Sequence, residues 1–197
     1  MQSTIFTTPV VNTALRAVSA AFLRLSGWRI EGALPAEARR AVLIAAPHTS
    51  NWDLPYTLMV AFALGLNVCW MGKQQIFRWP FGPVMRWLGG IAVNREQASN
   101  LVAASAAAIV AADGPLQLIV PPEGTRSKVR EWKTGFYWIA HSAGVPIVLA
   151  YMDYKAKRSG LGPLLRPSGD IEADMRTIKA FYAPFAGRNA GQFDAKN

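Results

Sequence analysis

The feature that most restricts how this chain folds is a short apolar run that leads into a turn bracketed by prolines. Residues 42–46 are all apolar, and Pro47 connects them to His48-Thr49-Ser50-Asn51-Trp52-Asp53. Pro47 disfavours helical backbone at the residue before it, whereas Pro55 is well tolerated in the first turn of a helix. The run therefore predicts a strand, then a loop that carries His48, then a helix that begins near Asp53.

The spacing of His48 and Asp53 limits how their side chains can meet. On one continuous helix, five steps of about 100° would place them roughly 140° apart, on different faces. They meet only if His48 lies in a turn and Asp53 lies at or near the start of the next helix. A carboxylate in that position can fix the imidazole tautomer and support it as a general base. The pair alone is a weak signal, because such spacing also arises by chance.

Apolar segments of strand length alternate with segments of helix length along the chain. The predicted strands are residues 28–31, 42–46, 67–71, 91–93, 116–120 and 145–150. The predicted helices are residues 53–64, 84–88, 96–113, 136–143 and 175–182. This alternation predicts an α/β fold, a single-domain αβα sandwich with a mainly parallel sheet, in which sites gather at the carboxyl ends of strands.

An amphipathic segment precedes this pattern. Residues 10–25 carry an apolar stripe within an arc of about 80°; its members are Val11, Leu15, Val18, Phe22 and Leu25. We expect an N-terminal amphipathic helix within residues 1–26 and a catalytic domain over residues 27–197. Arg16 and Arg24 lie off the stripe, so the helix could rest on a bilayer surface. Packing against the protein's own core is about equally consistent with the pattern.

A second segment, residues 77–88, mixes aromatic side chains, arginines and helix breakers. Trp79 and Trp87 suit an interface where one end of the ring is apolar and the other is wet. We expect either a surface that contacts lipid or an acyl chain, or a seam of the core.

The charge and the metal-binding residue types narrow the function classes. The chain of 197 residues has a net charge of +9 and a pI near 10.1, which indicates an anionic partner such as nucleic acid, anionic lipid or a phosphorylated substrate. Its single cysteine, Cys69, excludes an internal disulfide framework, and two histidines argue against a multi-histidine zinc site. We expect no metal. The sequence also predicts no transmembrane span and no secretory signal.

A second polar cluster follows the predicted strand at residues 116–120. Glu123-Gly124-Thr125-Arg126 supplies a carboxylate, a permissive glycine, a hydroxyl and a guanidinium within four residues. Arg126 can bind phosphate through two hydrogen bonds, and Gly124 lets the backbone approach a ligand closely. The alternative is a turn with a surface salt bridge.

These segments together resemble the glycerolipid acyltransferase superfamily. Residues 48–53 match its first block, H-x4-D. Residues 89–95 (GGIAVNR) match its second block, in which an arginine follows a glycine by six residues. Residues 122–127 (PEGTRS) match its third and most specific block. Residues 145–148 (VPIV) resemble its fourth block, and all four occur in the family's order. One departure is Leu149, where the family often has a second proline.

The resemblance implies transfer of a fatty acyl group from a thioester, on acyl carrier protein or coenzyme A, to a hydroxyl. The acceptor would be a lysophospholipid such as 1-acylglycerol-3-phosphate. His48 would be the general base and Asp53 would orient it, and no enzyme nucleophile is needed because the acceptor hydroxyl attacks. Arg126 would hold the acceptor phosphate and Glu123 a glycerol hydroxyl, with Gly124 and Thr125 in the same substrate loop.

Two further cations are candidates for substrate binding. Arg95 is a plausible second cation for the substrate; the alternative is that it forms a structural salt bridge at the end of a strand. Lys73 could reach a phosphate, although a solvated surface lysine is the more ordinary interpretation. No cofactor is expected beyond the acyl thioester, which is a co-substrate.

The expected enzyme is a peripheral membrane acyltransferase on the cytoplasmic face. A rival within the enzyme class transfers the acyl group to a non-phosphate acceptor, such as a sugar or an amino-acid lipid. A rival from another class is a non-catalytic basic module that binds membrane or nucleic acid. We expect no nucleic acid as partner, because the basic residues are dispersed and no nucleic-acid motif is present.

Overall fold

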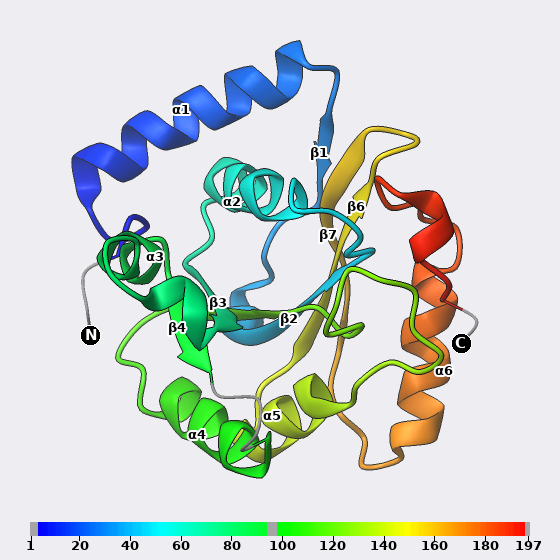
Figure 1. Cartoon of the computed structure of the whole chain (residues 1–197). Helices are drawn as coiled ribbons and strands as arrows, with labels where there is room; N and C mark the ends of the chain where they lie inside the picture. The colour runs from blue at the N-terminus through cyan, green and yellow to red at the C-terminus, as the bar shows by residue number, and fades with distance from the viewer. Residues whose placement is uncertain (1–3, 94–97, 196–197) are drawn as a thin grey trace.

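The computed structural model describes residues 4–93 and 98–195, which form a mixed α/β structure around one sheet (Figure 1). The seven strands of this sheet lie in the order β1-β7-β6-β2-β5-β3-β4. Their bounds are β1 Arg29–Glu31, β2 Arg40–Ala46, β3 Val68–Lys73, β4 Gly90–Val93, β5 Leu116–Val120, β6 Ile147–Asp153 and β7 Arg158–Leu165. Neighbouring strands are parallel except β6 and β7, so the predicted mainly parallel sheet is confirmed.

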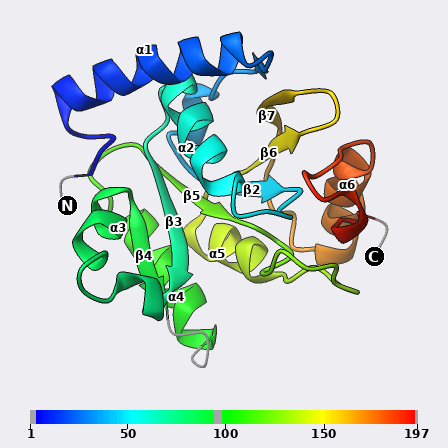
Figure 2. The same ribbon diagram turned by 45° about the horizontal axis from the view of Figure 1, so that its top comes forward.

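Helices cover both faces of the sheet, as an αβα sandwich requires (Figures 1 and 2). On one face lie α1 Pro9–Leu25, α2 Asp53–Leu64 and α3 Gly82–Trp87. On the other lie α4 Ala98–Val110, α5 Gly135–Ala143 and α6 Ile171–Tyr182. Two large apolar clusters, one on each side of the sheet, hold these layers together.

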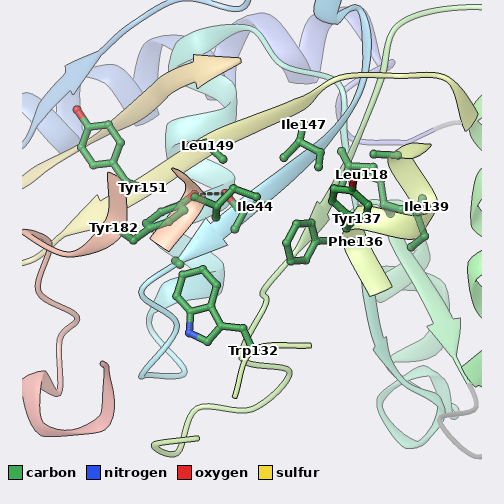
Figure 3. Close-up of a cluster of buried hydrophobic side chains, with 14 of the residues drawn as sticks. Ile44, Leu118, Trp132, Phe136, Tyr137, Ile139, Ile147, Leu149, Tyr151 and Tyr182 are labelled. Carbon is green, nitrogen blue, oxygen red and sulfur yellow. Dashed lines mark hydrogen bonds between the residues drawn. The ribbon is translucent and has the colours of Figure 1, made fainter. Parts of the chain in front are cut away.

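Alternate side chains of β2 supply both clusters. Ile44 packs with Phe136 on the α5 side, whereas Leu43 packs with Phe62 of α2 on the opposite side. On the α5 side, the Tyr182 hydroxyl of α6 lies 3.1 Å from the Ile44 carbonyl oxygen and 2.8 Å from that of Ala150 (Figure 3). This buried hydroxyl ties β2 to β6 close to their carboxyl ends, where the polar loops begin.

Among the strands of the described residues, β7 is the one that the sequence pattern did not predict. Its Gly160, Gly162 and Pro163 are unusual inside strands, because glycine weakens a strand and proline cannot donate to a ladder. The structure accommodates them. A Cβ at Gly160 would lie 1.9 Å from the Glu31 carbonyl oxygen, so the close approach of β1 requires glycine. Pro163 lies beyond the three residues that pair with β1, on an edge that needs no donor.

The two segments with alternative interpretations contribute to both core and surface. In α1, Val11 and Leu15 pack against the α2-side cluster, whereas the later part of the stripe is exposed, with Phe22 47% and Leu25 88% accessible. In the second segment Phe77 is buried, but Trp79 is 90% accessible. No helix in the part of the chain that the structure describes has the length and apolar character needed to span a membrane.

Candidate active site

His48 lies in the loop between β2 and α2, and Asp53 is the first residue of α2. This is the arrangement that the sequence predicts. The His48 Nδ1 atom lies 3.2 Å from Asp53 Oδ2, and the two side chains are 24% and 5% accessible. With Nδ1–H directed at the carboxylate, the lone pair of the neutral ring is on Nε2. The ring is therefore oriented to accept a proton on its far side.

Asp53 is held on both of its carboxylate oxygens. The backbone N–H groups of Thr49 and Ser50 donate to Oδ2 at 2.7 and 2.9 Å, and the Tyr154 hydroxyl donates to Oδ1 at 2.8 Å. Burial raises the pKa of Asp53, but the hydrogen bonds from His48, Ser50 and Tyr154 outweigh it and lower the pKa below its usual value. The carboxylate is thus ionised at neutral pH and able to stabilise a charged imidazole.

Glu123 lies beneath the His48 loop. It is 3% accessible, and its Oε1 accepts a hydrogen bond from the His48 backbone N–H at 2.9 Å. Its Oε2 is buried and has no hydrogen-bond partner among the described residues. Burial is the main reason that the pKa of Glu123 rises to about 7, although the bond from His48 opposes this rise. In this position the carboxyl group supports the backbone of the His48 loop.

The rest of the Glu123–Arg126 cluster reaches the surface. Gly124 has a φ of +64°, and a Cβ there would lie 2.9 Å from Cδ of Lys133, so both the backbone and the packing favour glycine. Thr125 and Arg126 are exposed. The amide nitrogen of Gln192, in the orientation that satisfies its neighbours, donates to the carbonyl oxygens of Thr49 and Arg126 at 2.9 and 2.8 Å. The structure thus brings Arg126 beside the His48 loop.

The segment after α6 also belongs to the site, and sequence analysis missed it. The Asn189 side-chain amide donates to the Thr49 carbonyl oxygen at 2.8 Å, and its backbone N–H donates to Thr49 Oγ1 at 3.2 Å. The Arg188 guanidinium lies over the rings of Trp52 and Tyr154, at 5.6 and 5.8 Å from their centroids. No periodicity marks these polar residues, so only the tertiary structure identifies them.

The two further cations predicted for the site have different outcomes. Lys73 is exposed at the carboxyl end of β3, and β5 lies between that strand and β2. It makes no contact with His48 or Asp53 within the described part of the chain. Arg95 falls outside the described residues. Over those same residues, no group of three or more histidine, cysteine, aspartate or glutamate side chains is arranged to hold a metal ion.

A pocket extends from His48 and Asp53 between the sheet and α2. His48 and Asp53 line one part of it, and most of the remaining lining is apolar. The apolar residues come from β2, α2, β5, β6 and β7 and include Leu43, Val60, Ile119, Ala150, Met152 and Leu161. The site therefore combines a supported imidazole with a largely apolar pocket.

Comparisons with known proteins give the family and the fold of the chain. Residues 27–153, more than half of the chain, match the model of the Acyltransferase family. The crystal structure of the 1-acyl-sn-glycerophosphate (LPA) acyltransferase PlsC from Thermotoga maritima is similar, with a TM-score of 0.62 at 17% sequence identity. The match covers 87% of this chain and 76% of that one, and it shows a common fold. Among curated protein sequences there is no significant match.

The family match spans the apolar strand β2, the His48–Asp53 pair and the Glu123–Arg126 cluster. It ends at Asp153, so Tyr154 and the segment after α6 lie outside it. Such membership disfavours a non-catalytic binding module. The chain belongs to the Acyltransferase family, as its resemblance to the glycerolipid acyltransferase superfamily predicts, and it is an acyltransferase.

Proposed function

We propose that this acyltransferase moves a fatty acyl group from a thioester to the hydroxyl of a lysophospholipid such as 1-acylglycerol-3-phosphate. The observation that carries the proposal is the supported His48–Asp53 pair at a mostly apolar pocket. The Thermotoga maritima protein of similar fold is an acyltransferase for 1-acyl-sn-glycerophosphate. The donor is acyl carrier protein or coenzyme A carrying the acyl chain, and the enzyme needs no other cofactor.

In the proposed mechanism, His48 Nε2 takes the proton of the acceptor hydroxyl as its oxygen attacks the thioester carbonyl. A new C–O bond forms, and the C–S bond then breaks. The imidazolium returns its proton to the departing thiolate, so the enzyme ends the cycle unchanged. Asp53, ionised and directed at Nδ1, stabilises the imidazolium between these two steps.

The surroundings of the pair support an assignment of the two substrates. The apolar lining from α2 and the sheet suits the hydrocarbon chain of the donor. Arg126, exposed at the edge of the catalytic loop, suits the phosphate of the acceptor. Glu123 is too deeply buried to be the first choice for a glycerol hydroxyl, so we assign it the support of the His48 loop.

Peripheral association with a membrane, at its cytoplasmic face, is part of the proposal. Trp79 and Phe81 are 90% and 66% accessible, and the exposed Arg78 and Arg86 flank them. The backbone N–H of Ile5 donates to the Trp87 carbonyl oxygen at 2.8 Å, which places the segment before α1 beside α3 (Figure 1). Exposed aromatic rings next to cations favour an anionic bilayer surface.

Acyl transfer with purified components tests the proposal. Labelled acyl-coenzyme A or acyl carrier protein is mixed with 1-acylglycerol-3-phosphate, and the product is identified by mass. We expect His48→Ala to lower the rate by the ~10²–10⁴-fold typical of losing a general base. A folded His48→Ala protein with an unchanged rate would contradict the mechanism.

The same assay separates the phosphate acceptor from its rival. Arg126→Ala should raise KM for 1-acylglycerol-3-phosphate and leave KM for the thioester unchanged. Equal turnover of a phosphate-free alcohol, insensitive to Arg126→Ala, would favour the sugar or amino-acid lipid acceptor.

A further inference from the structure

Tyr154 is the residue directly after β6, and it contacts the catalytic carboxylate from a part of the chain remote from the His48 loop. Its hydroxyl donates to Asp53 Oδ1 at 2.8 Å. The other oxygen, Oδ2, accepts from the backbone of residues 49 and 50 and faces His48. Tyr154 is thus the single side chain, within the described residues, that holds the carboxylate by its outer oxygen.

The ring of Tyr154 is fixed by packing. It meets Trp28 edge to face, with centroids 5.2 Å apart and planes at 85°, and it meets Tyr56 at 5.8 Å and 67°. The Arg188 guanidinium lies 5.8 Å from the same ring. Such contacts restrict both torsions of the side chain, so the hydroxyl is delivered to one place.

We infer that Tyr154 is a positioning residue for the catalytic base, which prevents Asp53 from rotating and so keeps Oδ2 directed at His48. The inference rests on the proposed function only for its effect on the rate. Rotation about the Cβ–Cγ bond moves both oxygens, so the contacts of Oδ2 already oppose it, and the bond from Tyr154 to Oδ1 adds a second restraint on the same torsion. The result is a chain of contacts from Tyr154 through Asp53 to His48.

The charges around Asp53 support the same role. Three titratable groups face Asp53: His48, Tyr154 and, from beneath the loop, Glu123. Arg188 faces Tyr154. Burial raises the pKa of Asp53, and the bond from Tyr154 is among those that lower it. Removing the hydroxyl should therefore raise the pKa of Asp53 and weaken the base at acidic pH.

The test compares Tyr154→Phe with Tyr56→Phe. Both variants keep their ring in the same aromatic cluster, but the Tyr56 hydroxyl has no hydrogen-bond partner in the described structure, so this variant is the control. We expect Tyr154→Phe to lower kcat roughly 10-fold, the order that follows from losing one hydrogen bond to a charged group. KM should not change, because Tyr154 does not line the pocket. The acid limb of the pH profile should move to higher pH.

A second readout does not depend on turnover. The chain has two histidines, so ¹⁵N-histidine labelling gives two imidazole spin systems. In the wild type, the His48 Nδ1–H proton should be protected by Asp53, and in Tyr154→Phe its resonance should shift and exchange faster with water. Tyr56→Phe should leave this resonance unchanged.

A folded Tyr154→Phe protein with an unaltered resonance and an unaltered pH profile overturns the inference, as does an equal loss of kcat in both variants. If the wild type transfers no acyl group, the proposed function fails, and the NMR result alone decides the role of Tyr154.

Discussion

Replacing Glu123 with glutamine isolates the cost of a carboxyl group buried under the His48 loop. Glutamine keeps an oxygen that can accept from the His48 backbone N–H, so the hydrogen bond at 2.9 Å survives. Its amide nitrogen takes the place of Oε2, which has no partner among the described residues. An unpartnered buried amide is unfavourable, but this cost is the same at every pH. Any change with pH in the stability of the variant relative to the wild type therefore comes from the missing ionisation of Glu123.

The sign and the size follow from the raised pKa. Burial lifts the pKa of Glu123 from 4.5 in the unfolded chain to about 7 in the fold. The favourable contribution of the Glu123 carboxyl to the free energy of unfolding is fully present below pH 4.5. It declines as the carboxyl of the unfolded chain ionises, and it is lost as the pH rises through about 7. The difference of about 2.5 in pKa corresponds to about 3.5 kcal/mol, at about 1.4 kcal/mol for each tenfold change in the acid constant.

Urea unfolding at about pH 5 and about pH 8 measures the effect. Between these values, the free energy of unfolding of Glu123→Gln relative to the wild type should rise by about 2–3 kcal/mol. The exposed Glu131 provides the control, since Glu131→Gln also removes one carboxylate but not from a buried position. A difference that is flat with pH would refute the argument, because folding would then leave the pKa of Glu123 unchanged. A difference that falls as the pH rises would also refute it, because the ionised carboxylate would then be stabilised in the fold.

Two further predictions concern the proposed substrates and the membrane. Replacing Trp79 and Phe81 together by alanine should weaken binding to anionic vesicles at least about 10-fold, since burying one such side chain contributes about 1.5–3 kcal/mol; co-sedimentation measures it. Trp138→Ala, at an exposed tryptophan of α5 on the other face of the sheet, is the control, and equal loss in both would argue against a specific docking surface. Ala150→Leu should narrow the pocket and lower kcat/KM for long-chain thioesters more than for short-chain ones. An unchanged ratio of the two would indicate that the acyl chain lies elsewhere.

The parts of the site that sequence reasoning predicts are those fixed by local chemistry. Pro47 and Pro55 mark a strand, a loop and a helix start within a few residues, and the structure begins α2 at Asp53. The helix ends before Gly65, whose φ of +67° is the left-handed conformation that glycine adopts easily. Both boundaries depend on backbone preferences of proline and glycine, which can be recognised in the amino-acid sequence.

The parts that sequence reasoning misses depend on contacts between distant segments. Strand β7 is hidden by its glycines and Pro163, which become acceptable only once β1 and β6 are in place. Nothing in the sequence separates Glu123 from an exposed carboxylate, because its burial results from the loop that covers it. Asn189 reaches Thr49 across 140 residues of sequence, and polar residues without periodicity give no signal of such a contact.

The contacts around the His48 loop explain how the proposed base, although it is carried on a loop, can be held in one geometry. The loop supplies its own hydrogen bonds to Asp53 from residues 49 and 50, but these alone leave one carboxylate oxygen and the loop backbone unsupported. Tyr154, Glu123 and Asn189 each provide the missing restraint from a different part of the chain. Because the three restraints act on different atoms, their losses should not be equivalent. Loss of the Tyr154 hydroxyl should disturb the Asp53 carboxylate and move the acid limb of the pH profile of activity. Loss of the Asn189 side chain should disturb the loop backbone and leave the acid limb of this profile unchanged.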